Sequence, residues 1–244
     1  KKNLLIYDAI NSLLIKNKIL APKLYNESYK NNFIEIQDFG NESVLDLLKK
    51  KNGKRITLYK KSVNLLNKIQ KIKQNKIKDF KGKNYKIPIY RKNLLLKEAK
   101  LFSDWYVKEY ISKKKISKIK LQINKQIKFL LSNLKLKNNF FVHRDFHASN
   151  LMKYKNQLGT IDTQDALIGN RAYDLASLID DVRLRSKKKL KKNIYNYYLK
   201  SNKKNINEKY FLNDFQILSV LRNMKIIGIF TRLAKRDKKK NYLK

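Results

Sequence analysis

The fold of this 244-residue chain is decided by two neighbouring segments, His143-Arg-Asp-Phe-His-Ala-Ser-Asn150 and Gly159-Thr-Ile-Asp162. Asn150 follows Asp145 by five residues, and Asp162 follows Asn150 by twelve. An isolated His-x-Asp triplet arises easily by chance, but an amide and a second carboxylate at these spacings make chance a poor explanation. The short apolar run 140–142 predicts a strand that delivers Asp145 to the same place.

A β-hairpin is predicted between the two segments. The apolar-rich runs 151–154 and 158–162 are separated by Lys155-Asn-Gln157, which is a moderate hairpin signal. Antiparallel pairing centred on Asn156 would place Asn150 opposite Asp162 at the open end. Two oxygen ligands would then converge where a hard cation can bind.

These residue types are the ones that phosphoryl transfer needs. A carboxylate receives or orients the substrate hydroxyl, while an amide oxygen and a second carboxylate hold Mg²⁺ against the nucleotide phosphates. Asp145, Asn150 and Asp162 occur in that order. Because the chemistry of kinase loops rests on Asp and Asn, we expect His143 to bond the backbone and support the loop, and His147 to pack.

Composition indicates a folded chain of one domain or slightly more, because 42% of its residues are hydrophobic. The 59 basic and 19 acidic residues give a net charge of +40. A nucleic-acid partner would require a concentrated basic stripe, whereas these lysines are scattered through segments rich in Lys, Asn and Ile. Because AT-rich codons favour those three residues, we attribute the charge to compositional drift and predict no nucleic-acid partner.

Several features predict a cytoplasmic protein. There is no cysteine, and therefore neither a disulfide framework nor a thiolate metal site. The apolar stretch 217–230 is interrupted by Arg222 and Lys225, so no membrane span is expected. The run Leu4-Leu-Ile6, followed by Asp8, is too short for a signal peptide. The oligomeric state is left open.

Periodicity predicts an α+β fold that is mostly helical. Residues 1–40 should form a small mixed piece, with a helix over 4–16 and a hairpin of 23–27 with 33–37. Residues 41–244 should form a helical lobe that carries the catalytic hairpin. Its helices are expected near 43 and over 58–76, 91–110, 116–134, 172–182, 187–200 and 208–235. The polar run 79–85 is the best loop candidate.

Two of these helices carry further predictions. Glu98, Leu101, Phe102 and Trp105 fall at i, i+3, i+4 and i+7, so a carboxylate should share an apolar face. The isoleucines and leucines of 116–134 repeat at threes and fours, which predicts a buried amphipathic helix leading into the site.

The chain resembles the aminoglycoside phosphotransferase branch of the protein-kinase-like fold. It is most similar to the bacterial anomeric kinases that phosphorylate N-acetylmuramate and N-acetylglucosamine at C1 during peptidoglycan recycling. The resemblance covers nearly the whole chain and rests on the blocks Phe141–Met152, Ile161–Gly169, Arg171–Leu178 and Leu221–Leu233, with a further similar block at Glu98–Tyr106.

The resemblance implies ATP and Mg²⁺ as cofactors and a small sugar as substrate. Asp145 would be the catalytic base, with Asn150 and Asp162 as Mg²⁺ ligands. Asp165 would either assist a second metal or the sugar, or cap local backbone. Asp174 is expected to be structural, because an acid in the first turn of a helix interacts favourably with the helix dipole.

Other site residues follow from the same resemblance. Gln37 and Phe39, in a hinge-like segment, would offer backbone groups to adenine. Glu98 and Trp105 would contact the sugar; alternatively, Trp105 is core and Glu98 pairs with a lysine. Arg222 would receive an anionic group such as a lactyl carboxylate, as would Arg232, unless both are packing or surface arginines. The packing alternative is the stronger expectation for Glu98, Trp105 and both arginines.

The chain also departs from the family pattern. It opens at Lys1-Lys2 almost directly on a helix, and its six glycines include no pair with glycine-rich-loop spacing. No lysine can therefore be assigned to the ATP phosphates, and Asp8 cannot be assigned as its partner. Thr163 stands where the subgroup usually has an aromatic. Either the chain is an N-terminally truncated copy of an active kinase, or that part is lost and the protein is impaired or non-catalytic.

Two alternatives stay open for the function. The chain would be a kinase of another hydroxyl compound, such as an aminoglycoside, choline or homoserine. Aminoglycosides are polycations that a +40 protein repels, which makes them the weakest of these substrates. The other alternative is a non-catalytic basic binding protein that keeps a kinase-like lobe.

Overall fold

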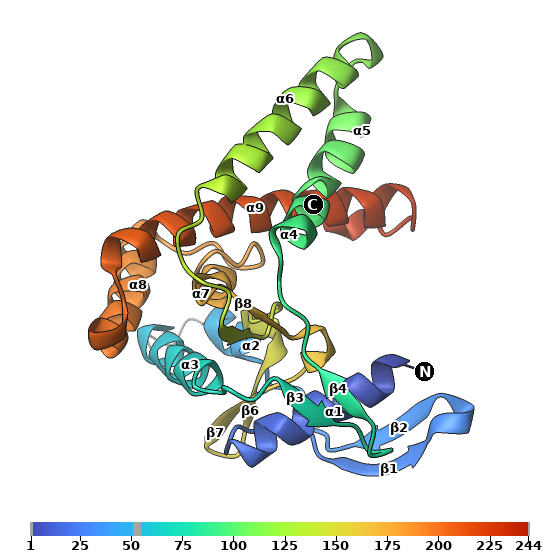
Figure 1. Cartoon of the computed structure of the whole chain (residues 1–244), viewed down its shortest axis with the longest axis vertical. Helices are drawn as coiled ribbons and strands as arrows, with labels where there is room; N and C mark the ends of the chain where they lie inside the picture. Colours follow the sequence, from blue (N-terminus) through green and yellow to red (C-terminus); the bar gives the residue numbers. More distant parts are fainter. Residues whose placement is uncertain (1, 51–54, 244) are drawn as a thin grey trace. The chain divides into compact units, whose positions relative to one another are not determined.

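The computed structural model describes residues 2–50 and 55–243, and the chain divides into two compact units. The first unit comprises Lys1–Ile89 and Lys137–Ile206, and the second comprises Tyr90–Leu136 and Asn207–Lys244. The chain therefore leaves the first unit and returns to it (Figure 1). The predicted boundary between residues 40 and 41 lies inside the first unit and stays a prediction.

The start of the first unit follows its sequence pattern closely. Helix α1 (Lys2–Lys16) buries Ala9, Ile10, Leu13 and Leu14 at helical spacing. Strands β1 (Leu24–Ser28) and β2 (Phe33–Ile36) form the predicted antiparallel hairpin across a short turn. Helix α2 (Val44–Lys49) begins after Ser43, whose side chain forms a capping box with Asp46.

Helix α3 (Arg55–Gln70) is shorter than predicted, because a small hairpin follows it. Strands β3 (Lys76–Lys78) and β4 (Asn84–Lys86) pair antiparallel, so the predicted loop 79–85 is instead a turn and part of a strand. The Asp79 carboxylate accepts hydrogen bonds from the amides of Lys81 and Lys83, and Gly82 has a positive φ of 72°. This turn chemistry is local and competes well with helix formation.

The remainder of the first unit carries the catalytic segments. Strand β5 (Phe140–Val142) is confirmed and pairs antiparallel with β8 (Leu167–Gly169). Strands β6 (Leu151–Tyr154) and β7 (Gln157–Thr160) form the hairpin between them. Helix α7 (Ala172–Ile179), all of whose residues are buried, and helix α8 (Lys188–Asn202) complete the unit.

The second unit is helical. It contains α4 (Lys92–Ala99), a π-helical turn η2 (Phe102–Val107), α5 (Lys108–Tyr110), α6 (Lys113–Ser132) and α9 (Glu208–Lys235) (Figure 1). The π-helical turn interrupts the predicted helix 91–110, so the spacing that put Glu98 and Trp105 on one face does not hold. Close packing accompanies the turn: a Cβ added to Gly228 of α9 would lie 2.2 Å from the carbonyl carbon of Leu101.

Helix α6 differs from its prediction in burial. Only Ile127 and Leu131 among its residues are buried, whereas Leu121 and Phe129 are 72% and 62% exposed. The prediction of a buried helix is therefore wrong, although the helix and its apolar spacing are present.

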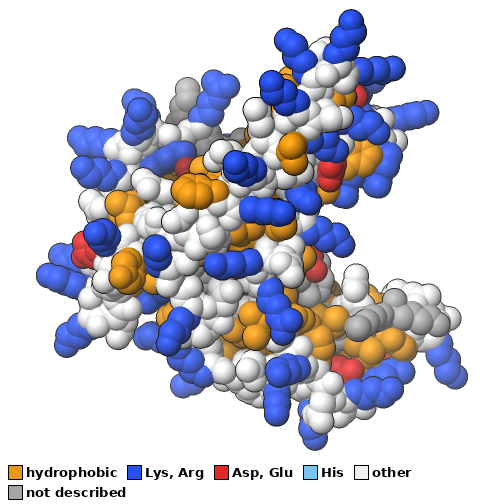
Figure 2. Space-filling view, turned by 45° about the horizontal axis from the view of Figure 1, so that its top comes forward, with side chains coloured by type: hydrophobic (Ala, Val, Ile, Leu, Met, Phe, Trp, Pro, Cys, Tyr) orange, Lys and Arg blue, Asp and Glu red, His pale blue; other side chains and the backbone are white. Residues whose placement is uncertain are grey.

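Basic side chains are spread over the face of the molecule seen in Figure 2, with few acidic side chains among them. Within the part of the chain that the structure describes, no helix is long and apolar enough to cross a membrane. The mostly helical α+β composition predicted from the sequence is confirmed.

Candidate active site

The hairpin β6–β7 has a register one residue away from the predicted one. Leu151 pairs with Thr160 and Tyr154 with Gln157, so the turn consists of two residues and not three. Lys155 in this turn has a φ of 53°, which suits the tight turns that match strand twist. The carbonyl of Asn150 accepts the amide of Ile161 at 3.0 Å, and Asp162 lies one residue further on.

Asp162 stands at the end of this hairpin in a left-handed conformation, with φ 62° and ψ 42°. Asp is one of the few residues other than Gly that visits this region routinely. The next residue anchors the turn, because the buried Thr163 hydroxyl donates to Oδ1 of Asn11 on α1 at 2.6 Å. This hydrogen bond ties the turn at Thr163 to α1. Oδ1 of Asp162 accepts from Gln164 at 3.3 Å, and its side chain is exposed.

Asn150 connects the two segments that carry the carboxylates. Its side-chain nitrogen donates to the Asp145 carbonyl at 3.1 Å, which aims the amide oxygen away from that contact. Its own carbonyl is bonded to the strand that leads into Asp162. The backbone segments of Asp145, Asn150 and Asp162 are therefore tied together, although the register puts Asn150 opposite Ile161 and not opposite Asp162 as predicted.

A buried carboxylate supports the backbone just before Asp145. Asp174, in the first turn of α7, accepts the amide of His143 at 2.7 Å and that of Arg144 at 2.9 Å. Arg144 has a φ of 77°, so the loop bends sharply at this point. These contacts are the structural basis for the supporting role proposed for Asp174.

The side chains of the two histidines in this segment, His143 and His147, are both buried. Nε2 of the fully buried His143 lies 2.6 Å from the Thr160 hydroxyl on β7, and the side chain also has a backbone hydrogen-bond partner at Ile161, as expected from the sequence. Burial lowers the pKa of His143, and the negative charge of Asp145 opposes that shift only in part. His143 is therefore neutral at pH 7. His147 is buried, with Nδ1 2.9 Å from the Ser149 hydroxyl.

Sequence reasoning missed one supporting residue, Asp181. Its buried carboxylate accepts the amide of Ala148 at 3.2 Å and both the amide and guanidinium of Arg183 at 3.1 Å. Nothing in the local pattern marks it, because the contact exists only once the chain beyond α7 has folded back onto the loop.

A cavity of about 390 Å³ lies beside Asp162 in the same unit. It is lined by Tyr7, Pro22, Ile36, Gln37, Asp38, Phe39, Gly40, Met152, Ile161 and Asp162. The predicted hinge residues Gln37 and Phe39 therefore share a cavity with a predicted metal ligand. Oε1 of Gln37 is buried and has no hydrogen-bond partner, so it can accept a hydrogen bond from a ligand.

A metal ion bound beside Asp162 would have few protein ligands. No group of three or more His, Cys, Asp or Glu within 2–50 and 55–243 is placed to hold a metal ion. The donor set that fits a hard cation is the Asn150 amide oxygen and the Asp162 carboxylate, completed by phosphate oxygens and water. Asp165 forms a 3.4 Å ion pair with Arg144 while its side chain is 56% exposed.

The residues predicted for the sugar belong to the second unit. Glu98 is buried, accepts a hydrogen bond from the Tyr90 hydroxyl, and forms a 3.2 Å ion pair with Lys225. This pairing with a lysine is the packing alternative considered from the sequence. Trp105 is half-buried in the π-helical turn, and Arg222 is buried on α9.

A family model described as the phosphotransferase enzyme family matches residues 50–205. The chain belongs to this family. Its fold is that of solved phosphotransferases: it matches an ADP-bound aminoglycoside phosphotransferase with a TM-score of 0.61 at 18% identity, covering 95% of this chain and 75% of that one. A Cryptosporidium parvum choline kinase gives 0.58 at 18% identity, with 99% and 76% covered.

Among curated proteins, the relatives are named N-acetylmuramate/N-acetylglucosamine kinase. The one from Pseudomonas aeruginosa is 27% identical over 239 residues, covering 96% of this chain and 68% of the relative. The one from Neisseria meningitidis is also 27% identical, covering 91% and 66%. The chain thus spans about two thirds of their length. The resemblance and the protein-kinase-like fold predicted from the sequence are confirmed.

Proposed function

We propose that this phosphotransferase is an ATP- and Mg²⁺-dependent kinase of the anomeric C1 hydroxyl of an N-acetylated amino sugar, N-acetylmuramate or N-acetylglucosamine. The observation that carries the proposal is that hydrogen bonds of Asn150 connect the segments of Asp145 and Asp162, and that Asp162 lines a cavity together with the hinge residues. The names of the relatives support the choice of amino sugar. A cytoplasmic role in peptidoglycan recycling belongs to the same proposal.

The cavity beside Asp162 suits a nucleotide base. Ile36, Met152 and Ile161 provide apolar surface for a planar ring, and Oε1 of Gln37 is an acceptor for an exocyclic amino group. Asp162 at the edge of the cavity would then lie toward the phosphates. Asn150 and Asp162 would hold Mg²⁺, which neutralises charge on the phosphate oxygens when it is bound.

Asp145 acts on the sugar hydroxyl. Its carboxylate accepts the hydroxyl proton as the sugar oxygen forms a bond to the γ-phosphorus, and the bond from that phosphorus to the β,γ-bridging oxygen breaks to release ADP. Positioning supplies most of the rate in such reactions, so the backbone contacts from Asp174 and Asp181 serve catalysis by holding the loop that carries Asp145.

Phosphorylation of a substrate panel tests the proposal. We expect the chain with Mg²⁺ and ATP to convert N-acetylmuramate or N-acetylglucosamine to a 1-phosphate, seen by ³¹P NMR coupling to the C1 proton. The matched control is the methyl glycoside of N-acetylglucosamine, in which the anomeric oxygen is blocked; it should give no product. Phosphorylation of that glycoside would overturn the anomeric assignment.

The same panel separates the alternatives. Choline, homoserine and an aminoglycoside represent other hydroxyl substrates, and turnover of one of these in place of the amino sugars would reassign the substrate. A non-catalytic basic protein would bind no nucleotide and would bind nucleic acid in a salt-dependent manner.

A further inference from the structure

A larger cavity of the first unit lies at the turn end of hairpin β6–β7, whereas Asn150 and Asp162 lie at its open end. Its volume is about 680 Å³, and its walls come from the segment after α1, from α3 and from the turn. Lys18, Lys61 and Lys68 line it. Asn64, Asn156 and Gln157 contribute amides, and the remaining four lining residues are apolar.

The charge lining this cavity is of one sign. No carboxylate lines it, and its three lysines form no ion pair with any residue that the structure describes. Lys61 and Lys68 are seven residues apart on α3, so they lie on one helical face with Asn64 between them. The cavity beside Asp162 is different, because it contains two aspartates and no lysine or arginine.

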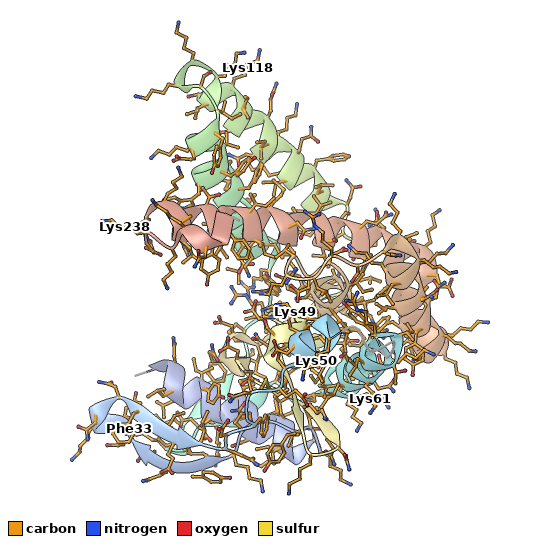
Figure 3. All side chains as sticks on the ribbon, turned by 180° about the vertical axis from the view of Figure 1, so that it is seen from behind. Phe33, Lys49, Lys50, Lys61, Lys118 and Lys238 are labelled. Atoms are coloured by element: carbon orange, nitrogen blue, oxygen red, sulfur yellow. The ribbon has the colours of Figure 1, made fainter. Side chains whose placement is uncertain are left out.

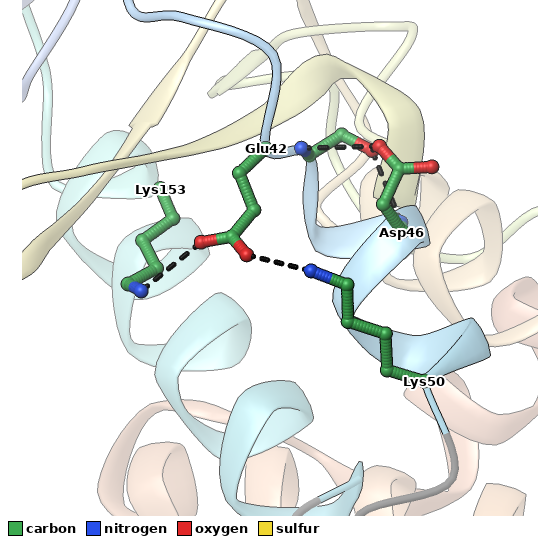
Figure 4. A network of polar contacts seen from close by, with 5 residues as sticks. Glu42, Asp46, Lys50 and Lys153 are labelled. Atoms are coloured by element: carbon green, nitrogen blue, oxygen red, sulfur yellow. Dashed lines mark hydrogen bonds and ion pairs between the residues drawn. The ribbon is translucent and has the colours of Figure 1, made fainter.

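An adjoining cavity of about 470 Å³ extends the basic surface. It shares Lys61 and the turn with the first cavity and adds Lys50, Arg55 and Lys153. Glu42 forms 3.0 Å ion pairs with both Lys50 and Lys153, which offsets part of their charge (Figure 4). Lys61 forms no ion pair with a described residue. It lies on α3 and is labelled in Figure 3.

We propose that the cavity lined by Lys18, Lys61 and Lys68 binds a small anion with several phosphate groups, at a site separate from the catalytic one. Its volume is in the range of small-molecule sites, roughly 300–1,000 Å³. Lysine ammonium groups bind phosphate as point charges, and the side-chain amides supply further donors. A single-stranded nucleic acid would call for aromatic stacking surfaces, and none of the described residues that line either cavity is aromatic.

The variants are placed on α3, because the segment after α1 is hydrogen-bonded to hairpin β6–β7 and the turn is part of that hairpin. The carbonyl of Leu20 accepts the amide of Thr160 at 3.0 Å, so changes there would disturb β7. Lys61→Glu/Lys68→Glu changes two exposed lysines instead. The matched control is Lys118→Glu/Lys125→Glu on α6, which has the same spacing, exposure and change in net charge (Figure 3).

Calorimetric titration with inorganic tripolyphosphate, in EDTA so that no metal joins the anion to Asp162, gives the readout. We expect the unaltered chain and the control pair to bind alike, and Lys61→Glu/Lys68→Glu to bind at least about tenfold more weakly, a difference of roughly 1.4 kcal/mol. Thermal melting checks folding, and Lys61→Gln/Lys68→Gln replaces the glutamate pair if that pair misfolds.

Three results would overturn the proposal. The first is absence of tripolyphosphate binding to the unaltered chain. The second is equal weakening by the two pairs of variants, which would mean attraction to the general charge of +40. The third is tighter binding of a single-stranded oligonucleotide through the same lysines, which would assign the surface to nucleic acid.

Discussion

At the scale of single residues, buried carboxylates hold the backbone of the catalytic loop. Asp174 accepts the amides of His143 and Arg144, and Asp181 accepts the amide of Ala148. Hydrogen bonds from amides to an ionised carboxylate are stronger than neutral ones. The position of Asp145, between these anchored residues, is therefore set by side chains from α7 and from the segment just after it.

Replacement of Asp174 measures this support. Asp174→Ala leaves one buried and one partly buried amide without their acceptor, so we expect a loss of about 2–4 kcal/mol in the free energy of unfolding. Asp174→Asn keeps one oxygen acceptor and should lose less. Urea denaturation gives both values, and an alanine variant as stable as the unaltered chain would contradict the assigned role.

The buried His143 predicts a pH dependence of stability. Because burial lowers its pKa in the folded state, the unfolded chain binds more protons below about pH 6.5. Stability should therefore be full above that pH and should fall as the pH decreases. Urea midpoints between pH 7.5 and 5.5 check this, and His143→Gln should flatten the dependence. An unchanged slope in that variant would point to other groups.

At the scale of elements, periodicity predicted well where local sequence decides structure. Helix α9 has the predicted bounds, and Ser43 begins α2. The sequence predicts the hairpin β6–β7 correctly but its register wrongly by one residue, because the register depends on the left-handed backbone of Lys155 in a two-residue turn. Tertiary contacts escaped prediction too: Asp181 reaches the loop only in the folded chain, and Gly228 packs closely against Leu101, which is far away in sequence.

Gly228 gives the sharpest prediction for an element. Ala in an exposed helix position is more stable than Gly by about 1 kcal/mol. At Gly228 the added methyl group would meet the backbone of Leu101 and Phe102 at 2.2–2.6 Å. We therefore expect Gly228→Ala to lower the melting temperature by several degrees, whereas the same change at an exposed helix position would raise it. A stabilised variant would show that the close packing of α9 on the π-helical turn is not required.

At the scale of the whole molecule, the candidate machinery is divided between the two units. Asp145, Asn150, Asp162 and the hinge belong to the first unit, and Glu98 and Arg222 belong to the second. The sequence indicated both sets through resemblance, but it did not indicate that the chain leaves the first unit at residue 89 and returns at 137. Packing between distant segments determines that division.

The net charge of +40 predicts a stability that rises with salt. Self-repulsion disfavours the compact state, and salt screens it. We expect the urea midpoint to increase between about 0.05 and 0.5 M KCl. Lys118→Glu/Lys125→Glu lowers the net charge by four and should show a smaller increase. A midpoint independent of salt would contradict a role for repulsion.

The most direct test of the proposed function is the rate of amino-sugar phosphorylation by Asp145→Ala, compared with Asp104→Asn, which alters an exposed carboxylate of the second unit. We expect the Asp145 variant to lose about 10²–10⁴-fold in kcat with an unchanged melting temperature, because the base is removed and the fold is not. The Asp104 variant should keep the rate of the unaltered chain. Equal rates in Asp145→Ala and the unaltered chain, or no turnover of any amino sugar, would contradict the account.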